Sequence, residues 1–137
     1  MLDVKISGGF IVNGDGKSII QGDIGIQGDR IVAIGDLRHL LARHSIDADN
    51  LYVCPGFIDV HSHTDDWYFI NPFAVSKILQ GVTTEIIGNC GESVVPPDST
   101  VDPTATSLEE FIRRLADSGI AINTATLIGH GNLRSII

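Results

Sequence analysis

The sequence carries little positive charge. Its 137 residues include 9 lysines and arginines against 17 aspartates and glutamates, which gives a formal net charge of -8 at pH 7 and an isoelectric point of about 4.8. Proteins that hold a phosphate backbone or an anionic membrane surface need a basic field. We therefore expect neither a nucleic-acid partner nor binding to a membrane surface.

Long apolar runs are also absent from the sequence. No stretch approaches the roughly 18 apolar residues that a bilayer-spanning helix needs. Residues 1–5 lead directly into strand-like alternation, without the apolar core of a signal peptide. The expected location is the cytoplasm.

Proline and cysteine are scarce as well. With 5 prolines, no low-complexity tract, 43% hydrophobic and 19% charged residues, the composition is that of a globular domain or a piece of a larger one. The two cysteines, in a sequence without secretory features, favour free thiols or a metal ligand over a disulfide. Cys54 ends an apolar run and is interpreted as a small buried thiol, whereas Cys90 lies in a glycine-rich turn.

Alternating polar and apolar residues dominate the N-terminal part. The alternation covers residues 3–12 and 19–34, is rich in Ile and Val, and is interrupted by glycine-containing turns. This pattern predicts short antiparallel strands. A short helical turn is expected over 37–44, where His39 and His44 are interpreted as solvated polar residues.

From residue 51 the pattern changes to strands alternating with helices. Leu51–Val60 is a nearly continuous apolar run with a Pro-Gly break, which predicts a strand buried on both faces. The elements expected after it are a helix over 72–79, a strand over 82–87, a helix capped by Ser107 and ending near Gly119, and a strand over 120–128. Such alternation indicates a parallel α/β arrangement.

Metal-ligand residue types follow the first of these strands. The strand leads into Asp59-Val60-His61-Ser62-His63, and residues two apart in a strand point to the same side, so both imidazoles face one space. Imidazole nitrogen suits zinc, and Asp59 could fix the orientation of a ring. A bare His-x-His also occurs by chance, and the alternative is two polar residues without a metal.

Further candidates follow the second and third strands. Cys90 lies in the turn Gly88–Gly91 and would lie on the same rim as His61 and His63 if the two strands are neighbours. A thiolate is a strong zinc ligand, so Cys90 is a candidate ligand beside the two histidines. The alternative for Cys90 is a small turn residue. His130 lies between glycines, where contact with metal or substrate competes with an ordinary turn histidine bonded to backbone.

The run Val53–His63 resembles the first barrel strand of the amidohydrolase superfamily, whose pattern is Pro-Gly-hydrophobic-Ile-Asp-x-His-x-His after a small β-sandwich. Within that superfamily the sequence is most similar to N-acyl-D-amino-acid deacylases. The segments that carry this similarity are Thr64–Asp66, Gln80–Thr84, Gly88–Gly91 and Ile128–Arg134. The similarity extends over essentially the whole chain, with Cys54 where an alanine is expected, a departure that affects packing and not chemistry.

The resemblance implies a metal-dependent (β/α)8 barrel preceded by a small β-sandwich. Residues 1–54 would form most of the sandwich, and residues 55–137 would form the first three barrel strands. The implied zinc ligands are His61, His63 and Cys90. Further ligands and a catalytic aspartate would come from later strands, beyond residue 137.

Four other residues are candidates for hydrogen bonds to the ligands or for contact with substrate. These residues are Asp59, Asp65, Asp66 and His130. For Asp65 and Asp66, solvated loop acids are an equally good interpretation.

The implied reaction is zinc-dependent hydrolysis of the amide bond of N-acyl-D-amino acids, which are small-molecule substrates. A cyclic-amide hydrolase of the dihydroorotase or hydantoinase type would share the first strand, but the Cys90 turn argues against it. A third interpretation is a non-catalytic fragment. By itself the 137-residue chain is expected to be inactive and to self-associate, because strands intended for burial would be uncovered.

Overall fold

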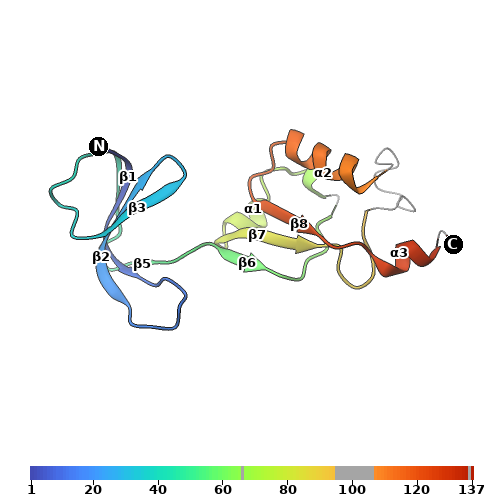
Figure 1. The fold of residues 1–137 in the computed structure, drawn as a ribbon, viewed down its shortest axis with the longest axis horizontal. Coiled ribbons are helices and arrows are strands. Elements are labelled where there is room, and N and C mark those ends of the chain that lie inside the picture. Colours follow the sequence, from blue (N-terminus) through green and yellow to red (C-terminus); the bar gives the residue numbers. More distant parts are fainter. Residues whose placement is uncertain (66, 95–106, 136) are drawn as a thin grey trace. The chain divides into compact units, whose positions relative to one another are not determined.

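The computed structural model describes residues 1–65, 67–94, 107–135 and 137. The chain divides into two compact units, Met1–Pro55 and Gly56–Ile137, drawn in Figure 1. The first unit is a β-sheet, and the second combines a parallel sheet with helices. The α/β class expected from the sequence is therefore confirmed. None of the helices in the described ranges is long and apolar enough to cross a membrane.

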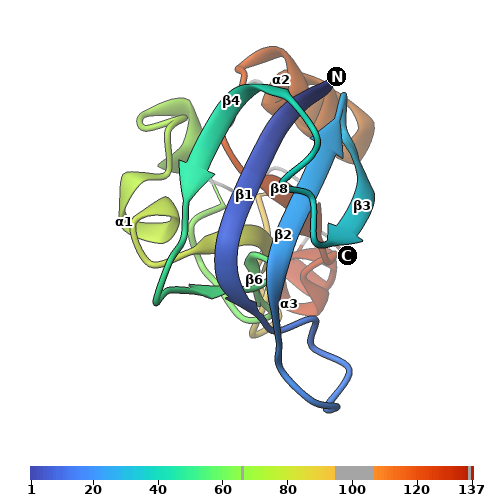
Figure 2. The ribbon, with the colours of Figure 1, turned by 90° about the vertical axis from the view of Figure 1, so that its left-hand side faces the viewer.

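The first unit is a five-stranded sheet with the order β3-β2-β1-β4, and the short strand β5 also pairs with β1 (Figure 2). Its strands are β1 (Leu2–Ile11), β2 (Ile20–Gln27), β3 (Arg30–Gly35), β4 (Ala42–Asp47) and β5 (Tyr52–Val53). The pairings of β1 with β2 and of β2 with β3 are antiparallel, which confirms the strands expected from the alternation.

The expected helical turn over 37–44 is wrong. A single turn, in which Leu40 N donates to Leu37 O, is followed by β4, which runs parallel to β1 from Ala42 onward. Backbone pairing with a strand distant in sequence outweighs the local helical preference of this segment. His39 and His44 are both exposed, as expected of solvated polar residues.

A buried carboxylate stabilises the first unit. Asp23 Oδ1 accepts from Gly8 N at 2.9 Å and its Oδ2 accepts from Leu37 N at 2.9 Å. Gly8, at φ 78°, lies where the register of β1 against β2 shifts. Asp23 therefore satisfies backbone donors that a bulge and a loop leave without sheet partners.

The second unit contains a three-stranded parallel sheet of order β6-β7-β8. Its elements are β6 (Phe57–Asp59), η1 (Trp67–Phe69), α1 (Val75–Ile78), β7 (Val82–Ile87), α2 (Leu108–Asp117), β8 (Asn123–Thr126) and α3 (His130–Ser135). The expected parallel arrangement, the strand over 82–87 and the helix capped by Ser107 are confirmed. The elements η1 and α3 were not expected, and α1 and β8 are shorter than expected.

The apolar run Leu51–Val60 is not one buried strand, as the sequence suggested. It splits into β5 and β6, which belong to different sheets, with Pro55 and Gly56 between them. Proline has no N–H to donate to a sheet ladder, so it separates the two strands. Cys54 lies in this connection and is exposed, which corrects its interpretation as a buried thiol.

The core of the second unit lies between the sheet and its helices. Phe111 and Leu115, four residues apart on α2, are buried together with Ile87 of β7. The other buried members of this cluster are Tyr68, Ala74, Val94 and Ile122. This packing fixes the strand ends from which the candidate site residues project.

The N-cap of α2 permits a direct stability test. Ser107 Oγ accepts from Glu110 N at 3.2 Å, so Ser107→Ala should lower the free energy of unfolding by about 1 kcal/mol. Urea unfolding followed by circular dichroism measures the change. Ser76→Ala, at an exposed position within α1, is the matched control and should have a much smaller effect. Equal changes in both variants would contradict the capping role.

Candidate metal centre

Three side chains with metal-binding atoms converge in the second unit. One ligand atom from each of His61, His63 and Cys90 lies within 4.8 Å of the others. His61 Nε2 is 3.2 Å from Cys90 Sγ, and the two imidazole centroids are 5.5 Å apart. All three residues are exposed, so the cluster opens to solvent. The structure thus brings together the three residues for which zinc ligation was expected.

This donor set fits zinc. Tetrahedral zinc with Zn–N near 2.0–2.1 Å and Zn–S near 2.3 Å places its ligand atoms roughly 3.3–3.7 Å apart. The His61–Cys90 pair, at 3.2 Å, is already close to that separation. All three ligand atoms lie within 4.8 Å of one another, and their side chains are exposed. Two imidazoles and a thiolate leave a fourth position for another ligand, for water or for substrate.

The turn that carries Cys90 has a tightly specified backbone. Cys90 has φ 57°, a left-handed conformation that is uncommon for a residue with a side chain. Gly88, at φ 76°, could not be replaced without a clash, because a Cβ there would lie 2.3 Å from Leu127 O. The packing of Gly88 against Leu127 thus fixes the backbone position of Cys90.

Two polar side chains join this turn to the histidine segment. Asn89 is buried, and its Nδ2 donates to Ser62 O at 3.2 Å and to Ile86 O at 2.8 Å. Asp65 Oδ1 accepts from Gly88 N at 3.0 Å. Asp65 therefore bonds to backbone within the site and is not simply a solvated loop acid. Asp66, the other loop acid considered, lies outside the described residues.

The segment that follows β8 also holds the Cys90 turn. Ser93 Oγ accepts from Gly129 N at 2.8 Å, and Ser93 N donates to the side-chain oxygen of Asn132 at 2.8 Å. His130 is exposed and opens α3, so it is a helical residue and not the turn residue suggested by its flanking glycines. The metal-ligand cluster found among the described residues does not include it.

Asp59 contacts the histidine segment through the backbone of His61. Its Oδ1 accepts from the backbone N of His61 at 3.2 Å, and its Oδ2 lies 2.7 Å from Lys77 Nζ. The hydrogen bond from Lys77, assisted by the one from His61, holds the pKa of the Asp59 carboxyl below its ordinary value. Asp59 thus stays ionised and orients the backbone of His61, and among the described residues no imidazole ring donates a hydrogen bond to it.

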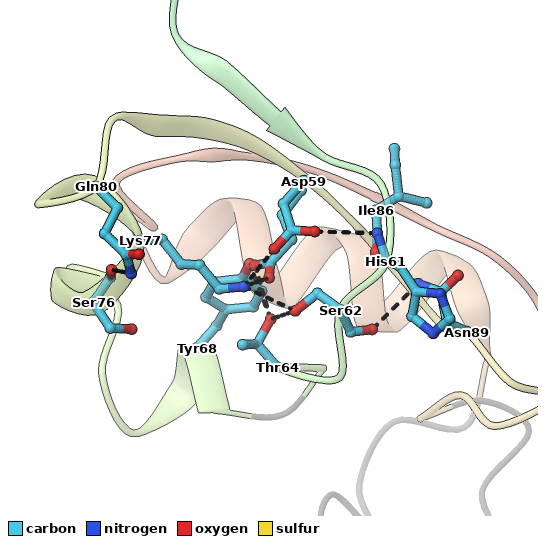
Figure 3. Close-up of polar contacts among 11 residues, drawn as sticks. Asp59, His61, Ser62, Thr64, Tyr68, Ser76, Lys77, Gln80, Ile86 and Asn89 are labelled. Carbon is cyan, nitrogen blue, oxygen red and sulfur yellow. Dashed lines mark hydrogen bonds and ion pairs between the residues drawn. The ribbon is translucent and has the colours of Figure 1, made fainter.

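A buried ion pair lies beneath the histidine segment, and sequence reasoning missed it. Glu85 on β7 is 0% exposed, and its Oε1 lies 2.7 Å from Lys77 Nζ. Its Oε2 accepts from Thr64 Oγ1 at 2.8 Å and from the Tyr68 hydroxyl. Figure 3 shows Lys77 pointing at Asp59, with Thr64 and Tyr68 alongside. The sequence did give a signal, because Glu85 interrupts an otherwise uncharged strand of the expected parallel sheet.

The charges in this pair stabilise one another. Burial raises the pKa of the Glu85 carboxyl, but hydrogen bonds led by that from Lys77 outweigh burial and hold the pKa below its ordinary value. Burial lowers the pKa of Lys77, but its hydrogen bonds to Asp59 and Glu85 raise it above its ordinary value. Both groups are therefore ionised at neutral pH.

Tyr68 should make the stability of the folded protein depend on pH in the alkaline range. Burial, with the hydrogen bond to Glu85, raises the pKa of Tyr68 from 10.0 to about 12. Between these values the folded state keeps a proton that the unfolded chain loses, so stability should fall as the pH rises from 10 to 12. Tyr68→Phe should cost about 1.5–3 kcal/mol at neutral pH, because a hydrogen bond to a charged group is lost.

Urea unfolding at a series of pH values tests both statements. Tyr68→Phe should also flatten the alkaline decline in stability. Tyr52→Phe is the control, since Tyr52 is an exposed tyrosine of the first sheet. Identical alkaline profiles for the parent chain and Tyr68→Phe would show that the buried phenol is not responsible.

The geometry of the site agrees with the sequence similarity. The sequence pattern of the amidohydrolase family matches residues 44–136, and the chain therefore belongs to the amidohydrolase family. The N-acyl-D-aspartate deacylase of Alcaligenes xylosoxydans xylosoxydans is 36% identical, over 96% of this chain and 29% of its own length. The resemblance expected from the motif residues is confirmed.

Solved structures give the same result. The N-acyl-D-glutamate deacylase of Bordetella bronchiseptica was determined with zinc and a phosphonate inhibitor that mimics the tetrahedral intermediate of its reaction. It matches this chain with a TM-score of 0.87 and 38% identity, covering 97% of this chain and 30% of its own. The L-hydantoinase of Arthrobacter aurescens matches with a TM-score of 0.67 and 25% identity, covering 99% of this chain and 31% of its own. This chain therefore spans less than a third of each of these proteins.

Proposed function

We propose that this chain contributes the zinc-binding part of an enzyme that hydrolyses the amide bond of N-acyl-D-amino acids. The observation that carries the proposal is the convergence of His61, His63 and Cys90, with 3.2 Å between His61 Nε2 and Cys90 Sγ. The proposal is supported by the names of the similar proteins, which are deacylases of N-acyl-D-aspartate and N-acyl-D-glutamate.

In the same proposal, β6, β7 and β8 are the first strands of a (β/α)8 barrel, within residues 55–137. Their parallel order supports it, as does the position of His61, His63 and Cys90 just after the carboxyl ends of strands, where such barrels place their active sites. The sheet formed within residues 1–54 is assigned to most of a small β-sandwich. The general-base aspartate and the remaining ligands are assigned to the part of the relatives' length that this chain does not span.

Zinc bound at such a site supplies a Lewis acid and an activated water for amide hydrolysis. The residues of this chain hold and orient the site. Asp59 fixes the backbone of His61, while Asn89 and Asp65 tie the histidine segment to the Cys90 turn. The site is open to solvent on the side where the three ligands are exposed, so a small amide substrate can approach there.

A cyclic-amide hydrolase of the hydantoinase type is the weaker candidate. The hydantoinase structure matches this chain less well than the deacylase structure, with a TM-score of 0.67 against 0.87. Comparing N-acetyl-D-amino acids, their L enantiomers and hydantoins as substrates of the full-length protein separates the two. Hydrolysis of hydantoins without hydrolysis of N-acetyl-D-amino acids would overturn the proposal.

The two cysteines supply a matched test of the metal centre. Both are free and exposed, but Cys90 belongs to the cluster and Cys54 does not. Cys90→Ser should therefore lower zinc content and zinc affinity strongly, whereas Cys54→Ser should leave both unchanged. Zinc per chain is measured by atomic emission after dialysis against zinc-free buffer. Equal losses in the two variants would show that the Cys90 turn is not the metal site.

A further inference from the structure

Three residues of the segment that carries His61 and His63 contact the ion pair of Lys77 and Glu85. Ser62, between the histidines, is only 5% exposed and its Oγ lies 3.3 Å from Lys77 Nζ. Thr64 donates to Glu85, and Asp59 pairs with Lys77 at 2.7 Å. The histidines face solvent while the residues around them turn toward one buried ion pair, as Figure 3 shows for Lys77, Asp59, Ser62 and Thr64.

Stability alone gives little reason for this ion pair. Glu85 is fully buried and the Lys77 side chain keeps 20% exposure. Taking a charge out of water costs up to several kcal/mol, and apolar residues of similar volume often stabilise a protein as well or better. An apolar pair could not, however, hold the carboxylate of Asp59 or the hydroxyls of Ser62 and Thr64. Each charge of the pair bonds to at least one of these groups in addition to its partner.

We propose that Lys77 and Glu85 are positioning residues of the metal centre. They hold residues 59–64 in the conformation that aims His61 and His63 at Cys90. This inference rests on the proposed zinc site. The Cys90 turn has further anchors outside the histidine segment, from Ser93 to Gly129 and Asn132, so loss of the ion pair should displace the histidines more than the thiol.

Cobalt(II) titration of the protein tests the inference, because sulfur-to-cobalt charge-transfer absorption reports ligation by Cys90. Lys77→Met should weaken cobalt binding about 10–100-fold, as loss of a residue that orients a metal ligand does in other sites. Arg113→Met is the control. It removes a cation from ion pairs with Glu110 and Asp117 on α2, and should leave cobalt affinity unchanged.

A double variant separates positioning from folding. Breaking a buried pair on one side is strongly destabilising, whereas replacing both members with apolar residues is often tolerated. In Lys77→Met/Glu85→Met, the Tyr68 hydroxyl and Thr64 Oγ1 can still pair with each other, since they lie 3.3 Å apart. We expect this variant to unfold at a urea concentration near that of the parent and still to bind cobalt about 10–100-fold more weakly.

Three outcomes overturn the inference. Parent-like cobalt affinity in the double variant would make the pair structural only. Failure of the double variant to fold would make the pair a folding requirement and not a positioning device. A parent protein without charge-transfer absorption that depends on Cys90 would remove the proposed metal centre and this inference with it. In contrast, a metal-binding parent with an unaffected double variant would leave the proposed function intact.

Discussion

Replacing His61 or His63 with alanine is expected to remove zinc from the proposed metal centre and, in a full-length protein, the proposed activity along with it. The described part of the chain supplies three clustered candidate ligands, so either substitution leaves two of these three. Structural and catalytic zinc sites use three or four protein ligands, and two are insufficient to retain the ion. The loss of affinity should exceed the roughly 10–100-fold expected when a residue that only orients a ligand is removed.

His44→Ala is the control for both substitutions. His44 is an exposed histidine of β4, in the first unit, and does not belong to the cluster. Zinc per chain after dialysis, with circular dichroism to establish that each variant is folded, measures the effect. If both His61→Ala and His63→Ala retain the zinc content of the parent, the assignment of these two ligands is wrong.

The three clustered residues could be predicted because their signals are local and the topology is simple. His61 and His63 directly follow one strand, and Cys90 follows the next. The carboxyl ends of neighbouring parallel strands meet at one edge of a sheet. Once β6 and β7 pair in parallel, sequence position alone brings the imidazoles and the thiol together.

The Lys77–Glu85 ion pair, strand β4 and the partner of Asp59 could not be predicted, because they depend on contacts between residues distant in sequence. Lys77 lies on α1, in the connection between β6 and β7, and pairs with Glu85 on β7. No periodicity in the sequence gives the orientation of α1 relative to β7, so this ion pair could not be predicted. β4 was missed for the same reason, since a parallel partner of β1 leaves no hairpin signal. Asp59 could be placed near the site from sequence, but its partner Lys77 could not.

The 137-residue chain by itself has an open strand edge through which it could self-associate. Within the described ranges, β6 pairs only with β7, which leaves its other edge open. Phe57, Ile58 and Val60 are 57%, 62% and 67% exposed along this strand and just after it. An open strand edge with large apolar side chains is a template for pairing with another chain.

We therefore expect the chain to self-associate and to show no hydrolysis of N-acetyl-D-amino acids above a metal-only control. Ile58→Lys places a charge on the open strand, which disfavours edge pairing, and should move the chain toward the elution volume of a 14.7 kDa monomer. Ile112→Lys is the control, because Ile112 is an exposed apolar residue on the helix α2 and not on β6. Size-exclusion chromatography at several protein concentrations measures self-association, and a zinc-supplemented amidase assay measures hydrolysis. A monodisperse parent monomer with turnover would show that the open β6 edge does not drive association and that the ligands present here suffice for catalysis.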